Sequence, residues 1–202
     1  QIMSLRLSEE EIIALGSRTE GWIAGLLLAA HSLQYEPDHK KFIEAFKGTD
    51  RHVVDYLIEE VLEHLPDEIQ EFILCTSILD RLSAPLCQVL VYGEGTADRC
   101  QEILELLERN NLFTIPLDNH RSWYRYHPLF AELLRYRLAL HAPEKVIDLH
   151  LLASKWLEAN GYLTEAINHA LIGKDNERIL DLIETHALEA ISKGEIRKVQ
   201  RW

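Results

Sequence analysis

Hydrophobic residues recur every three or four positions along most of the chain, the spacing that gathers them on one side of an α-helix. The nine glycines and six prolines are too few to interrupt this pattern often. Ser8 and Glu11 form a capping box, which predicts a helix over residues 9–15. A second helix is predicted over residues 22–33 and a short third one over residues 42–46.

A longer apolar stripe predicts a fourth helix in this part of the chain. It follows Asp50, an N-cap candidate, and it ends at Pro66, which cannot continue a helix. The stripe consists of Val54, Leu57, Ile58, Val61, Leu62 and Leu65. Residues 1–65 are therefore predicted to form a small helical domain.

After Pro66 helices give way to the only β-structure that the sequence predicts. Phe113, Ile115 and Leu117 alternate with their neighbours as residues of a strand do, and a polar turn leads to a second strand. Pro128 then suits the first position of another helix. The predicted elements are helices at 67–78, 84–92 and 97–110, strands at 112–117 and 123–127, and the turn at 118–122. Three helices, one β-hairpin and a closing helix predict a winged-helix domain over residues 66–142.

Residues 143–202 return to paired helices, with glycines between them. Gly161 and Gly194 lie 33 positions apart, close to the period of about 34 residues in tetratricopeptide (TPR) repeats. We therefore expect the start of a TPR-like superhelix, and a mainly α protein as a whole. Such arrays need about three repeats for stability. Because the chain begins at Gln1 and stops inside a helical pattern, we expect it to be a piece of a longer protein.

The charge balance narrows the possible partners. Lys and Arg number 21 against 33 Asp and Glu, a formal net charge of −12, so phosphate-rich or anionic surfaces would repel the chain as a whole. The longest apolar run, residues 22–30, is about half the length that spans a bilayer, and no secretory signal is present. Three cysteines on apolar helical faces, with no CxxC pair, argue against disulfides and a zinc site. A cytoplasmic location without a membrane partner is expected.

Catalytic motifs are absent from the sequence. The only pair in the order Gly-Lys, at 173–174, lacks the upstream glycine and the hydroxyl residue of a P-loop. The sequence contains no GxSxG, HExxH or EF-hand pattern. The acidic clusters at residues 9–11 and 67–68 begin predicted helices, where the helix dipole accounts for them. We expect no catalytic residue, no bound metal and no independent enzymatic activity.

His127 is the polar residue whose position suggests a task. It ends the second predicted strand and precedes the helix that starts at Pro128, so its imidazole can lie beside the free backbone N–H groups of Leu129 and Phe130. Such a helix start binds anions, and an imidazole donor adds to it. The alternative is a structural role, in which His127 caps the helix or pairs with a local carbonyl.

A winged helix can bind DNA, but the charges here argue against it. Residues 66–141 hold 7 Arg and no Lys against 11 Asp and Glu, which gives 7 − 11 = −4. The predicted groove-facing helix, 97–110, is itself acidic. A local basic cluster surrounds the hairpin and the last helix, and we expect its members to be solvated or to pair with acids or a nucleotide. The cluster consists of Arg121, Arg125, Arg135 and Arg137.

Several longer stretches together resemble a known family. They run in order as Arg18-Thr19-Glu20-Gly21-Trp22 with Ala24-Gly25-Leu26, Phe72 with Ser77-Ile78-Leu79 and Leu86-Cys87, Leu107-Glu108-Arg109 with Asn111-Leu112-Phe113, and Trp123 to His127 with Leu129-Phe130. Nearly the whole chain is similar to the central part of the large LuxR-type transcriptional activators, the kind that includes the activator of the maltose regulon. These activators belong to the signal-transduction ATPases with numerous domains (STAND).

The resemblance implies a parent protein with more parts than this chain holds. These would be an upstream P-loop ATPase domain, the helical, lid-like domain, the winged helix, superhelical repeats that sense a small-molecule or protein inducer, and a C-terminal helix-turn-helix that binds DNA. In the family the winged-helix histidine reaches the β-phosphate of ADP in the closed, inactive monomer, and His127 occupies that position. The family's Gly-x-Pro segment near the adenine falls on Gly21-Trp22-Ile23, where Ile23 replaces the proline.

The expected function is therefore that of a regulatory segment of an ADP/ATP-dependent activator. It would clamp nucleotide against the P-loop domain and relay inducer binding from the downstream repeats. The parent would be a slow ATPase switch, and the segment alone is not expected to bind nucleotide tightly. Two alternatives remain open: a free-standing TPR-like adaptor that binds only protein, and a winged-helix DNA binder.

Overall fold

The computed structural model describes residues 7–33, 38–46 and 62–192. It is mostly helical, with a single two-stranded antiparallel sheet among the described residues. The elements are α1 (Glu9–Thr19), α2 (Ile23–Leu33), α3 (His39–Ala45), η1 (Leu62–His64), α5 (Asp67–Thr76), α6 (Ala84–Val91), α7 (Asp98–Arg109), β1 (Thr114–Pro116), β2 (Tyr124–Tyr126), α8 (Pro128–His141), α9 (Pro143–Ala159), α10 (Leu163–Ile172) and α11 (Asn176–Ser192).

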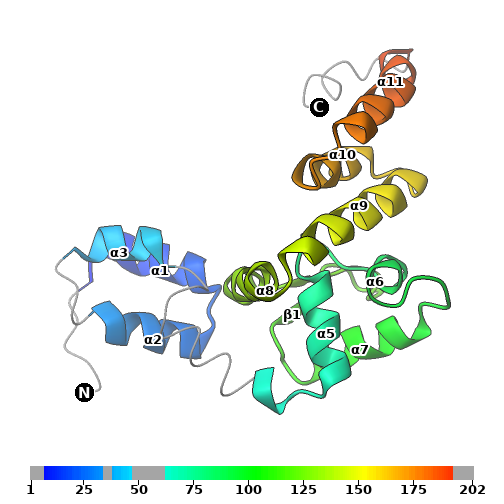
Figure 1. Cartoon of the computed structure of the whole chain (residues 1–202). Helices are drawn as coiled ribbons and strands as arrows, with labels where there is room; N and C mark the ends of the chain where they lie inside the picture. Colours follow the sequence, from blue (N-terminus) through cyan, green and yellow to red (C-terminus); the bar gives the residue numbers. More distant parts are fainter. Residues whose placement is uncertain (1–6, 34–37, 47–61, 193–202) are drawn as a thin grey trace.

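The helices α1, α2 and α3 form a group of their own on one side of the molecule (Figure 1). The predicted capping box is confirmed: Ser8 accepts from the Glu11 backbone, and Glu11 accepts from the Ser8 backbone at 2.7 Å. Helix α1 continues past the predicted end at Leu15, because its stop signal is the left-handed pair Glu20 and Gly21, with φ of 47° and 80°. Most of the predicted fourth helix lies outside the described residues.

The predicted winged helix is present and has an additional β contact. Strands β1 and β2 pair in register Thr114 to Tyr126 and Pro116 to Tyr124. On its other edge Tyr124 exchanges two backbone hydrogen bonds with Leu82, at 2.7 and 2.8 Å, a bridge that the sequence did not predict. The side-chain alternation expected for the first strand is wrong in part, because Thr114 is buried whereas Leu117 is exposed.

The core of this domain lies between α5, α6, α7 and α8. The largest of its fully buried side chains include Phe72, Leu86, Leu104, Tyr124 and Phe130. All three cysteines are free and buried there, as the apolar spacing predicted. None of the helices that the structure describes is both long and apolar enough to cross a bilayer.

Helices α9, α10 and α11 pack in succession away from the winged helix, with α10 folded back on α9, and α11 lies far from α1 (Figure 1). Only Ala142 separates α8 from α9. The paired packing of α9 and α10 is confirmed, and the small residues Ala153, Ala166 and Ala170 are fully buried there, whereas Leu171 is 51% exposed. Gly161, with φ of 82°, makes the turn between these two helices, whereas Gly194 lies outside the described residues.

Candidate functional site

Strand β2 presents two different faces because its side chains alternate. Tyr124 and Tyr126 point into the winged-helix core, with exposed fractions of 0% and 5%. Arg125 and His127 take the opposite face, and both contact the corner between α1 and α2. The strand and the residue that follows it thus carry two hydrogen-bond donors toward the helical group, Arg125 and His127, with the aromatic residues fixed behind them.

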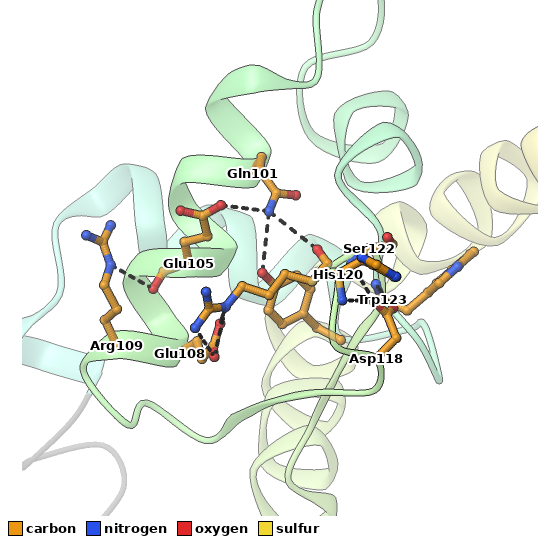
Figure 2. A network of polar contacts seen from close by, with 10 residues as sticks. Gln101, Glu105, Glu108, Arg109, Asp118, His120, Ser122 and Trp123 are labelled. Atoms are coloured by element: carbon orange, nitrogen blue, oxygen red, sulfur yellow. Dashed lines mark hydrogen bonds and ion pairs between the residues drawn. The ribbon is translucent and has the colours of Figure 1, made fainter.

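The hairpin that carries these donors is held firmly against α7 (Figure 2). Asp118 accepts backbone N–H groups from His120, Ser122 and Trp123 at 2.8 to 3.1 Å, which closes the turn between the strands. Arg121 forms a bidentate pair with Glu108 at 2.9 and 3.1 Å. These contacts fix the position of β2 from the side opposite to the α1–α2 corner.

His127 uses both ring nitrogens in the structure. Its Nδ1 accepts the backbone N–H of Leu129 at 3.3 Å, and therefore Nε2 carries the proton and donates to the carbonyl oxygen of Thr19 at 2.8 Å. The ring is 5% exposed. Burial lowers the pKa of His127, so the neutral imidazole is favoured.

The contact with Leu129 makes His127 the N-cap of α8, which is the structural alternative considered for this residue. The carbonyl that it binds is not local, however, because Thr19 lies 108 residues away on another module. His127 is thus enclosed, yet it faces the neighbouring helical group directly. A nucleotide contact stays a prediction, and it would require Nε2 to leave Thr19.

Two ion pairs accompany this hydrogen bond across the same interface. Arg125 pairs with Glu20 at 2.8 Å, and Arg18 pairs with Glu132 of α8 at 3.4 Å. We name these two pairs and the Thr19–His127 hydrogen bond the polar joint. Arg18 also donates to the carbonyl of Phe46 at 2.6 Å, which ties the joint to the segment after α3.

The predicted Gly21-Trp22-Ile23 segment forms the corner of this joint, but its members differ in position. Gly21 is exposed and adopts φ of 80°, which allows the sharp turn between α1 and α2. The Trp22 ring lies edge-on to Phe113 at 5.0 Å and to His127 at 5.9 Å between centroids. Ile23 is 74% exposed. The structure therefore brings Trp22 to His127 and leaves Gly21 and Ile23 on the surface.

Gly25 explains how Trp22 can lie so close to its own helix. A Cβ at this position would collide with three atoms of the Trp22 ring system. Any larger residue would therefore push the ring away from Phe113 and His127. This gives a physical reason for Gly25 in the motif.

Phe113 stores backbone strain beside the joint. Its φ is 55°, a left-handed value that is uncommon for an aromatic residue. The strained residue nonetheless makes specific contacts: its carbonyl accepts the His127 N–H at 2.7 Å, and its ring stacks on Phe130 at 5.0 Å. Such strain persists only where the surroundings fix it, as they do here.

The sequence analysis does not place Arg125 beside His127, although strand alternation predicts it. Strand alternation places residues 125 and 127 on one face whenever 124 and 126 are buried. Arg125 was assigned only to a general basic cluster. The expectation that this cluster pairs with acids is confirmed for Arg121, Arg125 and Arg135, whose partners are Glu108, Glu20 and Asp80.

Comparisons with known proteins identify relatives for this arrangement. Residues 58–146 match the family model described as the MalT winged helix domain. The chain is 34% identical over 205 residues to the HTH-type transcriptional regulator MalT of Yersinia pestis, an alignment that covers 98% of this chain and 22% of that protein. It is 36% identical over 181 residues to the serine/threonine-protein kinase PknK of Mycobacterium tuberculosis, with 89% of this chain and 16% of that protein covered. The chain thus spans about a fifth of the length of these relatives.

Proposed function

The chain is a MalT-like segment with a winged-helix domain of the MalT type, and from this premise we propose that it is the regulatory part of a nucleotide-dependent transcriptional regulator of the STAND class. A winged-helix region of this type is not a catalytic P-loop domain. Any ATP hydrolysis therefore belongs to another part of the parent polypeptide, and this segment controls how that part is used.

The two kinds of relative support a regulatory role over a chemical one. One is named as a helix-turn-helix transcriptional regulator and the other as a protein kinase. A segment that is shared by a transcriptional regulator and a protein kinase must have a role that depends neither on DNA binding nor on phosphoryl transfer. A switch that opens or closes the polypeptide fits both, whereas a dedicated DNA-reading surface does not.

The observation that carries the proposal is the hydrogen bond from His127 to the Thr19 carbonyl across two modules. A donor that leaves a backbone carbonyl for a phosphate oxygen gains a stronger, charge-assisted partner. Arg125, two residues earlier on the same strand face, offers a second donor once it separates from Glu20. His127 and Arg125 are therefore the side chains that would hold the β-phosphate end of ADP against an upstream P-loop domain.

The polar joint would then exist in two arrangements. In one, His127 and Arg125 bind the α1–α2 corner, as they do in the structure. In the other, they bind nucleotide, with Gly21, Trp22 and Ile23 close to the adenine. Bound ADP would supply only charge and shape here, and ATP and inducer would shift the balance by their different affinities for the two arrangements.

The remaining partners follow from the same proposal. The exposed apolar residues Ile23 and Leu27 on α2 suit contact with the upstream ATPase domain of the same polypeptide. The downstream repeats would carry the inducer signal, and DNA would be bound only by a helix-turn-helix domain beyond this segment. Such a regulator works in the cytoplasm.

Replacement of His127 by Ala in the full-length parent protein tests the proposal. We expect ADP to bind about tenfold more weakly, the loss typical of one charge-assisted hydrogen bond, and basal transcription to rise. His120→Ala is the matched control, because this exposed histidine lies in the hairpin turn away from the joint. If ADP affinity and basal transcription both stay at the wild-type level in His127→Ala, the proposed role is wrong.

A further inference from the structure

A cavity of about 330 Å³ lies on the other side of the winged helix, where α8 meets the first repeat helices. Ile78, Leu138, Val146 and Ile172 supply apolar walls. Its polar lining comes from Arg135 and Asp80 on the winged-helix side and from His150, Asn168 and His169 on α9 and α10. The cavity is therefore shared by two modules, and it is separate from the polar joint.

Two histidines form a direct pair in this cavity. His150 on α9 and His169 on α10 approach each other through their Nδ1 atoms at 2.8 Å, with ring centroids 4.8 Å apart. One Nδ1 must donate and the other accept, so the contact holds while at least one ring is neutral. Neither Nε2 atom has a hydrogen-bond partner among the residues that the structure describes.

Arg135 presents a cation to the same space. Its Nε donates to the carbonyl of Ser77 at 2.7 Å, and one terminal nitrogen contacts the Leu79 carbonyl and Asp80 at 3.3 and 3.0 Å. Within the described ranges the other terminal nitrogen has no partner. The side chain of Asp80 is 97% exposed, so water screens its charge and weakens its ion pair with Arg135.

The charged and titratable groups of the cavity determine whether it favours an anionic or a cationic ligand. The charged groups that line it are Arg135 and Asp80, which balance each other, and the two imidazoles can only add positive charge. A cation would find a single, already paired carboxylate. An anion would find an arginine with a spare donor and the protonated Nε2 of the accepting imidazole, and the other Nε2 becomes a donor when the pair takes up a proton.

The volume and the walls define the rest of the ligand. An apolar cavity of roughly 150 Å³ holds a benzene ring, so this one has room for a ring-sized body and a head group. We propose that the cavity binds a small carboxylate with an apolar body, its head group held by Arg135 and the His150–His169 pair. Because the site joins the winged helix to the repeats, the bound acid would fix their relative orientation.

Ligand binding in this site is coupled to proton uptake. Burial lowers the pKa of His150 to about 4 and also lowers that of His169. Arg135 acts in the same direction on both rings, whereas Asp80, and for His169 also Glu165, act in the opposite direction. A bound carboxylate adds negative charge beside the rings, and it should therefore draw a proton onto the pair.

Calorimetric titration of the 202-residue chain with benzoate at about pH 6 and about pH 8 tests this proposal. We expect tighter binding at the lower pH, by up to about tenfold for each pH unit over which one proton is taken up. Benzamide and benzylammonium have the same ring with a neutral or a positive head group, and we expect both to bind at least about tenfold more weakly than benzoate at pH 6.

Two substitutions assign the binding to this cavity. His169→Asn removes one of the two titrating rings and should weaken the pH dependence, because only His150 can then take up the proton. Ile172→Glu places an acid at a cavity residue that is 55% exposed and should prevent benzoate binding, whereas the uncharged Ile172→Gln should retain it. This comparison does not depend on the histidine pair for folding. His120→Asn, in the hairpin turn, is the control for a general loss of one histidine.

The proposal fails if benzoate shows no saturable binding at either pH, or if benzamide binds as tightly as benzoate. It fails equally if Ile172→Glu binds benzoate like Ile172→Gln. None of these measurements involves ADP or the polar joint. Failure here therefore leaves the proposed nucleotide switch untouched, and the reverse is also true.

Discussion

The winged helix is attached to its two neighbours by different chemistry. Toward α1 and α2 it uses the polar joint, three exchangeable contacts made by Thr19, Glu20 and Arg18, together with one aromatic ring, that of Trp22 against Phe113 and His127. Toward the repeats it uses an aromatic cluster in which the Trp123 and Tyr162 rings meet edge to face, and the Arg81 guanidinium lies over both, at 4.2 and 4.5 Å from their centroids. We name the latter the aromatic joint, which also includes Trp156 and the Arg81–Glu165 ion pair at 2.8 Å.

The difference concerns how easily each joint can change. Hydrogen bonds and half-exposed ion pairs exchange with water or ligand at small net cost, typically about 1 kcal/mol each. Aromatic rings packed around a guanidinium lose contact area and cation–π attraction together when they separate. We therefore expect the helical group to move relative to the winged helix, and the repeats to move with the winged helix as a lever.

The largest expected effect is at the aromatic joint. Tyr162→Ala removes the ring that contacts Arg81, Trp123 and Trp156, and it should lower the free energy of unfolding by about 3 kcal/mol. Urea denaturation measures this change. Tyr136→Ala is the control, because a tyrosine that is 50% exposed should change stability by only about 0.5 kcal/mol. Equal effects of the two substitutions would contradict a packed joint.

The second largest effect is expected from acid, which should lower the free energy of unfolding through His150 on α9. The pKa of His150 lies near 4 in the folded chain, mainly because of burial, against 6.5 for an unperturbed histidine. The unfolded chain therefore binds the proton more readily, so this stability is complete above about pH 6.5 and is lost as the pH falls toward 4. We expect a loss of about 2 kcal/mol across this range in wild type.

Denaturation curves of wild type and His150→Gln at several pH values measure this contribution. The variant should lose less stability than wild type on acidification, whatever its stability at neutral pH. The pKa of His127 is lowered in the same direction, so part of the acid sensitivity should remain. Parallel pH profiles for the two proteins would rule out the assigned role of His150.

A single methyl group added at the α1–α2 corner should change the stability of the fold. Gly25→Ala forces the Trp22 ring from its place beside His127 and should cost about 1 kcal/mol net, since alanine otherwise favours a helix. Gly16→Ala on α1 meets no neighbouring atom and should stabilise by about 0.5 to 1 kcal/mol. Opposite signs in thermal or urea denaturation check the prediction. A stabilising Gly25→Ala would mean that Trp22 does not lie on this helix.

The smallest effect is expected for the ion pair of the polar joint. Both side chains of Glu20–Arg125 are 31% exposed, so a double-mutant cycle with Ala should give a coupling of only about 0.5 kcal/mol. The coupling should fall further at high salt. A coupling of several kcal/mol that resists salt would show that the polar joint is as fixed as the aromatic joint.

Much of the local structure could be predicted, because local signals decide it. The capping box at Ser8, the turn at Asp118 to Ser122 and the helix that begins at Pro128 depend on residues within a few positions of each other. The ends of helices were predicted less accurately. Helix α1 was expected to end at residue 15, but it continues to Thr19, because Gly16 is tolerated inside a helix that packs against other elements.

The candidate site could be predicted only in part, because many of its contacts join residues that are far apart in the chain. His127 was identified from its place before a proline-initiated helix, and strand alternation could also have identified Arg125. The pairing of His150 with His169 had no sequence signal, because two histidines 19 positions apart meet only once α9 and α10 pack antiparallel. The Arg81 stack likewise joins residues that are far apart in the chain.

The sequence by itself determined the mainly helical composition, the hairpin, the burial of the cysteines and the place of His127 at the start of a helix. These depend on periodicity and short-range hydrogen bonding, which act along the chain. Only the tertiary structure decided that His127 donates to Thr19, that Arg125 pairs with Glu20, and that a cavity forms where α8 meets the repeats. Such contacts join distant residues, and they arise from how whole elements pack, a choice that no local pattern encodes.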